Sequence, residues 1–217
     1  MIGNLMILGD SYSTFKGYIV REDAYYYYPE EAREGDDKVR SMQLDETWWR
    51  RFVARTGAKL VRNDSWSGST ICYTGYLGDC SETSSFIYRY RCLLKEGFFE
   101  KNAVDTVIVF GGTNDSWCPA ELGEMKIAGQ TEEDLKTALP AISHIMSSMK
   151  NDLKGVRIVY IANCDIDTEI IECMKSEGER LGIEVVELSG IDKEAGHPTP
   201  LGMEQICNQV LSALGEG

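Results

Sequence analysis

The chain has 217 residues, of which 43% are hydrophobic and 26% are charged, and its formal net charge is -13 at pH 7. This length and composition are typical of a globular protein, and we expect one domain that spans residues 1–217. A surface this acidic repels phosphate backbones and anionic membranes, which excludes nucleic acid as an expected partner.

Short apolar runs alternate with longer helical patterns along the chain. Strands and helices in alternation favour an α/β fold, in which a five-stranded parallel sheet is covered by helices on both faces. The elements predicted, in chain order, are strand Asn4–Leu8, helix Thr47–Thr56, strand Lys59–Asn63, helix Ser84–Lys95, strand Thr106–Phe110, helix Glu132–Asp152, strand Arg157–Ala162, helix Thr168–Leu181, strand Glu184–Glu187 and helix Leu201–Leu214.

Local signals indicate where two of these helices begin. Thr131 precedes three acidic residues, a pattern typical of a helix N-cap with negative charge in the first turn. Pro200 suits the first turn of the last helix. Two long irregular stretches, Lys16–Asp45 and Ser116–Gln130, follow motif residues and are expected to overhang the functional site.

Four polar motifs follow the predicted strands. Because the carboxyl ends of parallel strands lie at one edge of the sheet, we expect all four motifs on the same rim. They are Gly9-Asp10-Ser11 after the first strand, Ser67-Gly68 after the second, Gly111-Gly112-Thr113-Asn114-Asp115 after the third, and Gly196-His197-Pro198-Thr199 beyond the fifth.

Ser11 and His197 are the side chains expected to carry a reaction. A serine hydroxyl becomes an effective nucleophile when a base removes its proton. Of the two histidines, His197 lies in a loop, whereas His144 lies within a predicted helix and is expected to be structural or to face solvent. Attack on an ester carbonyl creates an oxyanion, for which the backbone N–H groups of Ser11 and Gly68 and the amide of Asn114 are candidate donors. We expect no metal and no other cofactor, because the sequence has no cluster of histidines and cysteines with ligand spacing.

In combination, these motifs resemble the SGNH (GDSL-type) hydrolase superfamily, and the resemblance covers residues 9–202. It implies a flavodoxin-like, three-layer α/β/α domain that hydrolyses ester bonds with a serine nucleophile. It also implies that Ser11 is the nucleophile and the first oxyanion donor, that Gly68 and Asn114 are the other donors, and that His197 is the base.

The acidic partner of His197 stays open at this point. Many SGNH hydrolases have an aspartate three residues before the histidine, where this chain has Glu194. Glu194 keeps that spacing with one methylene more, whereas Asp192 keeps the residue type but needs a wider loop. We favour Asp192 slightly, because a shorter carboxylate is easier to hold in one orientation. A Ser-His dyad supported by a backbone carbonyl is the third alternative.

Aromatic residues near the motifs suggest a substrate. Tyr12, Trp66 and Trp117 lie within a few residues of motif positions, and flat rings with a polar group can stack on sugar faces. The alternative is that these rings pack the loops onto the core. The leading hypothesis is a carbohydrate esterase that removes acetyl or another short acyl group from a saccharide ester. The alternatives are a lysophospholipase or thioesterase that acts on longer chains, and a non-catalytic binding module on a hydrolase fold.

The sequence also gives expectations about location. It has no run of 18 apolar residues, so membrane insertion is not expected. No signal peptide is visible, although a secretory leader that had been removed would leave no trace. Seven cysteines without a CxxC pair are typical of reduced thiols in a cytoplasm-like compartment; one bridge, such as Cys72 with Cys80, is the alternative. Nothing in the sequence indicates an oligomeric state.

Overall fold

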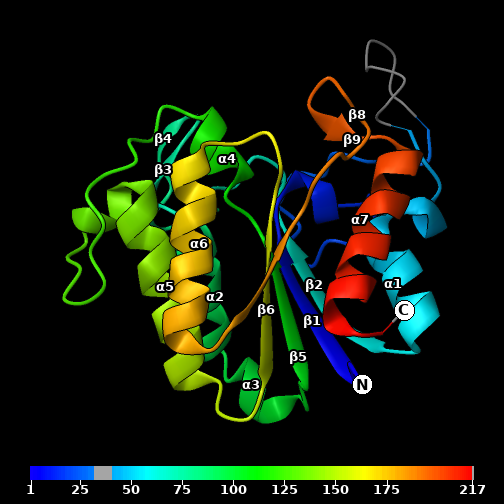
Figure 1. Ribbon diagram of the computed structural model, residues 1–217, viewed down its shortest axis with the longest axis horizontal. Coiled ribbons are helices and arrows are strands. Elements are labelled where there is room, and N and C mark those ends of the chain that lie inside the picture. The colour runs from blue at the N-terminus through cyan, green and yellow to red at the C-terminus, as the bar shows by residue number, and fades with distance from the viewer. Residues whose placement is uncertain (32–40, 217) are drawn as a thin grey trace.

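The centre of the protein is a parallel sheet of five strands in the order β2-β1-β5-β6-β7. The computed structural model describes residues 1–31 and 41–216. Helices cover both faces of the sheet, which confirms the expected three-layer α/β/α fold (Figure 1). The strands are β1 (Asn4–Gly9), β2 (Lys59–Ser65), β5 (Thr106–Phe110), β6 (Arg157–Ala162) and β7 (Glu184–Glu187).

The helices form two layers. α1 and α7 pack together on one face of the sheet, and α2, α5 and α6 lie on the other (Figure 1). Among the residues that the structure describes, no helix is long and apolar enough to cross a membrane. The helices are α1 (Trp48–Thr56), α2 (Phe86–Lys95), α3 (Phe98–Lys101), α4 (Thr113–Trp117), α5 (Ala138–Asp152), α6 (Thr168–Leu181) and α7 (Pro200–Leu214).

The sheet is buried on both faces, as its strand sequences predict. In β5, Val107 and Val109 point into the apolar cluster under α2, α5 and α6, whereas Ile108 and Phe110 point into the cluster under α1 and α7. All four side chains are completely buried. Burying a side chain of this size contributes about 1.5–3 kcal/mol, so alternation along the strand stabilises both helical layers at once.

Most predicted boundaries agree with the structure. β5, β6, β7 and α6 have the predicted bounds, β1 continues to Gly9 and β2 continues to Ser65. The remaining helices with predicted bounds, apart from α5, differ at their N-termini by one or two residues. A difference of one or two residues is within the ordinary variation of helix ends, which fray and depend on local capping.

The predicted helix Glu132–Asp152 is wrong at its beginning. The structure has a short 3-10 turn over Asp134–Lys136, and α5 begins only at Ala138. Pro140 explains the break, because a proline in a helix interior lacks the N–H and clashes with the carbonyl four residues earlier. Pro140 is therefore tolerated only in the first turn of a helix.

Thr131 also has a different role from the predicted one. Its hydroxyl accepts a hydrogen bond from the N–H of Asp134 at 3.3 Å, and the Asp134 carboxylate accepts from the N–H of Thr131 at 2.6 Å. Thr131 therefore stabilises the 3-10 turn, and Thr137 occupies the N-cap position of α5. All seven cysteines lie in described residues and are free, including Cys72 and Cys80.

Candidate active site

The turn after β1 positions Ser11. Ser11 begins a 3-10 turn, and the Asp10 carboxylate caps it by accepting the N–H of Tyr12 at 3.0 Å. A side chain at Gly9 would place a Cβ 2.6 Å from the Cβ of Ser13, which is shorter than any real contact of this kind. The turn therefore needs glycine at position 9, and it holds the Ser11 hydroxyl at the carboxyl edge of the sheet.

His197 reaches Ser11 from a different part of the chain. It lies in a small hairpin formed by β8 (Lys193–Glu194) and β9 (His197–Pro198), directly before α7. Its Nε2 is 3.1 Å from Ser11 Oγ, although 186 positions separate the two residues. This distance is within the range that proton transfer requires. The structure thus brings together the two side chains predicted to react.

Aromatic rings surround the His197 imidazole. Tyr27 stacks on it with ring centroids 3.6 Å apart and an interplanar angle of 5°. Trp117 approaches at 6.1 Å with an angle of 69°. The first irregular stretch therefore overhangs the site through Tyr27, while its residues 32–40 lie outside the described residues. The run of four tyrosines at 25–28 lies in this stretch, but the sequence carries no signal that Tyr27 is the one that stacks on His197.

The three aromatic residues predicted to contact substrate differ in how exposed their side chains are. Tyr12 is completely buried, and its hydroxyl donates to the carbonyl of Gly196 at 2.5 Å, so Tyr12 supports the hairpin and cannot stack on a sugar. Trp66 is mostly buried and lines a small pocket next to Gly68. Trp117 is 38% exposed beside His197, where its ring is open to a ligand.

The second imidazole nitrogen faces a backbone oxygen. His197 Nδ1 is 3.3 Å from the carbonyl oxygen of Ala195. The Asp192 carboxylate accepts a hydrogen bond from the hydroxyl of Thr199, and Glu194 is the residue opposite His197 in the β8–β9 register. The third alternative, a Ser-His dyad supported by a backbone carbonyl, therefore has the Nδ1 contact in its favour.

The candidate oxyanion donors lie at the same edge of the sheet. Gly68 follows β2 with a φ of +80°, a conformation that favours glycine. Asn114 lies in α4, and its Nδ2 donates to the carbonyl of Ser69, the neighbour of Gly68, at 2.9 Å. Its Oδ1 accepts the hydroxyl of Tyr76 at 3.2 Å. Asn114 is thereby tied to the segment that carries Gly68.

Two buried charged residues hold this segment: Asp115, which ends the third motif but had no predicted role, and Arg89, which lies outside the motifs. Asp115 accepts the N–H groups of Ile71 and Cys72 at 2.9 and 3.0 Å, and burial raises its pKa. Arg89 donates to the carbonyl of Gly9 at 3.1 Å and to Ser69 Oγ at 3.1 Å. A charged residue on a helix is usually exposed, so the sequence around such a residue does not predict a buried supporting role.

Arg89 also pairs with a buried carboxylate. Its Nη1 lies 2.6 Å from the carbonyl oxygen and 3.1 Å from Oδ1 of Asp64, at the end of β2. Burial lowers the pKa of Arg89, and the charge of Asp64 opposes that effect. Arg89 therefore joins the ends of β1 and β2 to the segment of Ser69.

Asp10 is an acid with an unusual environment directly before Ser11. It is completely buried, and burial raises its pKa to about 7, although the N–H of Tyr12 acts in the opposite direction. Within the described part of the chain, its Oδ2 has no hydrogen-bond partner. Ionisation of the Asp10 carboxyl therefore costs more free energy than ionisation of an ordinary surface carboxyl.

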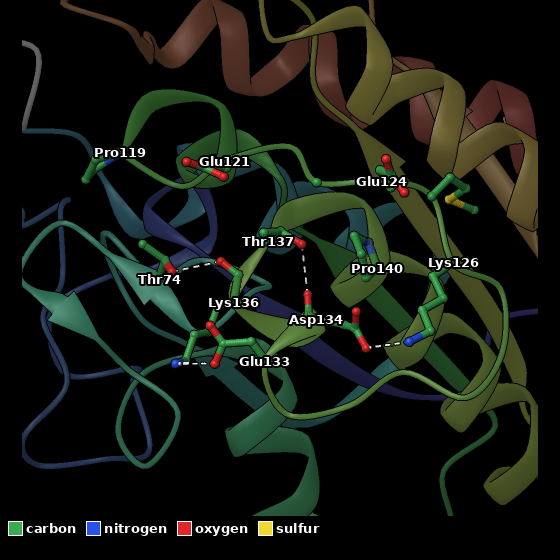
Figure 2. Close-up of a pocket in the computed structure, with 12 residues that line it drawn as sticks. Thr74, Pro119, Glu121, Glu124, Lys126, Glu133, Asp134, Lys136, Thr137 and Pro140 are labelled. Atoms are coloured by element: carbon green, nitrogen blue, oxygen red, sulfur yellow. Dashed lines mark hydrogen bonds and ion pairs between the residues drawn. The ribbon is translucent and has the colours of Figure 1, made fainter.

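Two pockets lie near these elements. A pocket of about 300 Å³ adjoins Gly68 and is lined in part by Tyr25, Trp66 and Tyr76. A larger pocket of about 740 Å³ lies between the stretch after α4 and the start of α5 (Figure 2). Its two lysines pair with acidic residues of the same pocket, Lys126 with Asp134 and Lys136 with Glu133, each at 2.6 Å. Of these two pockets, the smaller one is lined by Gly68, a candidate oxyanion donor.

The fold and the site together define a class of protein. A serine hydroxyl beside an imidazole, with amide donors at the carboxyl edge of a three-layer sheet, is the arrangement of a serine-dependent hydrolase. In residues 1–31 and 41–216, no group of three or more His, Cys, Asp or Glu side chains is placed to hold a metal ion.

The family follows from comparison with known proteins. The chain belongs to the GDSL-like lipase/acylhydrolase family, whose model matches residues 3–214, and it is an ester-bond hydrolase. No curated protein matches the chain significantly.

Solved structures agree with this family. A protein assigned as a GDSL-like lipase from Bacteroides ovatus ATCC 8483 is 34% identical, with a TM-score of 0.89 and 100% of both chains covered. A second one, from Bacteroides uniformis ATCC 8492, is 37% identical, with a TM-score of 0.88, and 98% of this chain and 95% of that chain are covered. A family two carbohydrate esterase from Cellvibrio japonicus shares the fold at 14% identity, with a TM-score of 0.62 over 99% of this chain and 62% of that chain.

Proposed function

We propose that this esterase removes short acyl groups from carbohydrate esters and that Ser11 and His197 carry the reaction. The observation that supports this mechanism best is the 3.1 Å distance between Ser11 Oγ and His197 Nε2. Ser11 attacks the acyl carbonyl while His197 takes its proton, and His197 then protonates the leaving alcohol. Water attacks the acyl-enzyme in the same way and regenerates the serine.

The proposed oxyanion hole consists of the N–H groups of Ser11 and Gly68 and the amide of Asn114. The Asn114 Nδ2 carries two hydrogens, and one of them is directed to the carbonyl of Ser69. The second hydrogen can meet the developing oxyanion. Removal of one such donor typically costs about 10²–10³ in turnover.

The proposed dyad uses the backbone to orient its base. In this proposal the carbonyl of Ala195, 3.3 Å from His197 Nδ1, accepts the Nδ1 hydrogen, so that Nε2 carries no hydrogen and can accept the Ser11 proton. Tyr27, stacked on the imidazole, restricts the rotation of the ring. In this proposal Asp192 contributes by accepting the hydroxyl of Thr199, the residue directly before α7.

The proposed substrate class follows from the surroundings of the site. Tyr25, Trp66 and Trp117 provide rings of the kind that stack on sugars, and the net charge of -13 disfavours anionic headgroups. The fold also occurs in a family two carbohydrate esterase, as described above. A longer acyl chain would need a long apolar groove, because each buried CH₂ contributes about 0.8 kcal/mol.

Ester hydrolysis by the wild-type chain and by Ser11→Ala tests this proposal. We expect turnover of acetylated oligosaccharides and of p-nitrophenyl acetate by the wild type, and loss of both in the variant with an unchanged melting temperature. A kcat/KM that keeps rising with acyl length beyond about eight carbons would instead favour the lysophospholipase or thioesterase alternative. Failure of a fluorophosphonate probe to label Ser11, together with no turnover, would favour the non-catalytic binding module.

A further inference from the structure

Tyr76 is presented to the site by a small hairpin. It occupies the turn between β3 (Thr74–Gly75) and β4 (Gly78–Asp79), which lies at the same end of the molecule as α4 (Figure 1). The base of this hairpin is fixed, because the N–H of Cys80 donates to the carbonyl of Tyr73 at 2.8 Å. The Thr74 hydroxyl donates to the carbonyl of Lys136, also at 2.8 Å. Tyr76 is therefore held beside α4 although its side chain is partly exposed.

The Tyr76 hydroxyl contacts the side chain that the proposed mechanism uses as an oxyanion donor. It donates to Asn114 Oδ1 at 3.2 Å, while Asn114 Nδ2 donates to the carbonyl of Ser69 at 2.9 Å. A carboxamide has one acceptor end and one donor end. The two bonds together therefore determine which way round the Asn114 amide lies, and they leave one Nδ2 hydrogen available.

The hydroxyl can keep this role over a wide pH range. Desolvation raises the pKa of Tyr76 to about 12, so the group stays protonated and remains a donor in neutral and mildly alkaline solution. No comparable bond to Asn114 Oδ1 would exist with phenylalanine at this position, because its ring has no donor.

The Tyr76 ring also lines the pocket of about 300 Å³ next to Gly68. In the proposed reaction His197 protonates the leaving alcohol, so the alcohol must lie on the side of His197. Gly68, the other proposed oxyanion donor besides Ser11 and Asn114, lines the same pocket as Tyr76. Tyr76 thus contacts Asn114 through its hydroxyl and shares a pocket with Gly68.

We propose that Tyr76 is a positioning residue, whose hydroxyl holds the Asn114 amide in the orientation that stabilises the oxyanion. This inference rests on the function proposed above. The proposal predicts that the Tyr76 hydroxyl stabilises the transition state through Asn114. It also predicts that this hydroxyl contributes little to binding of the ground-state ester.

Steady-state kinetics of Tyr76→Phe with p-nitrophenyl acetate test this role. We expect kcat to fall about 3- to 10-fold, as loss of one hydrogen bond allows, with KM within about twofold of the wild-type value. Tyr18→Phe is the matched control, because Tyr18 is 47% exposed and Tyr76 is 48% exposed. The control should keep the wild-type kcat. An unchanged kcat in Tyr76→Phe, or a change confined to KM, would overturn the proposal.

A double-mutant cycle separates positioning from a general structural effect. In an Asn114→Ala background, Tyr76→Phe should cause no further loss of kcat, because its target is already absent. A loss in that background as large as in the wild type would show that Tyr76 does not act through Asn114. If the wild-type chain hydrolyses no ester, the proposed function fails before Tyr76 is tested, so the two failures are distinguishable.

Discussion

Replacement of Asp10 by asparagine should make the stability of the protein less dependent on pH. Asp10 is completely buried, and its pKa is raised from the ordinary value of 3.8 to about 7. Its Oδ1 accepts the N–H of Tyr12 at 3.0 Å, and asparagine can keep that bond with its own carbonyl oxygen. The substitution thus removes the titration while it preserves the cap of the turn.

The magnitude follows from the two pKa values of Asp10. The folded and unfolded states differ in pKa by about 3, and each pKa unit corresponds to about 1.4 kcal/mol, so the full effect is about 4 kcal/mol. Because the folded state has the higher pKa, it binds the proton more tightly. The favourable contribution of the protonated acid is complete below about pH 4, and it is lost as the pH rises through about 7.

Urea unfolding of the wild type and of Asp10→Asn at pH 5 and pH 8 measures this effect. The free energy of unfolding of the variant relative to the wild type should be higher at pH 8 than at pH 5 by about 2.5 kcal/mol, since part of the titration lies below pH 5. Asp115, whose pKa is also raised by burial, is present in both proteins, and its charge is a minor cause of the raised pKa of Asp10. Glu22→Gln, at an exposed position, is the control. Parallel pH dependences for Asp10→Asn and the wild type would refute the reasoning.

Two further substitutions test the supports of the site. Arg89→Met should lower the free energy of unfolding by about 3 kcal/mol, because it removes a buried cation from Asp64, although Arg62 still pairs with that carboxylate. A loss below about 1 kcal/mol in urea unfolding would contradict this. Ala195→Gly should raise the free energy of unfolding by about 0.5–1 kcal/mol, because Ala195 has a φ of +48° and glycine adopts this conformation without strain. A lower melting temperature by calorimetry would count against it.

Local patterns in the sequence were sufficient for much of the fold. The run Thr106–Phe110 is apolar on both faces, so it had to be a strand buried on both sides, and β5 has the predicted bounds. The start of α5 was not predicted correctly, because the helix predicted from Glu132 runs through Pro140. Pro140 excludes an uninterrupted helix through steric hindrance at the preceding turn, which is also a local effect.

The candidate site could be predicted only in part. Ser11 and His197 were predicted to meet because motifs that follow parallel strands gather at one edge of the sheet, and the structure places them 3.1 Å apart. For Tyr12 the sequence left open whether the ring meets substrate or packs onto the core, because its exposure depends on the β8–β9 hairpin, to which its hydroxyl donates.

The sequence by itself determined the three layers, the positions of strands along the chain and the set of polar residues at the carboxyl edge. These features follow from periodicity and turn chemistry, which act over a few neighbouring residues. Only the tertiary structure decided which side chains touch. The contacts of Arg89 with Gly9, of Tyr76 with Asn114 and of His197 Nδ1 with Ala195 depend on side-chain orientations that packing sets. Hydrogen bonds require distances accurate to a few tenths of an ångström, and a sequence pattern specifies only which elements are close.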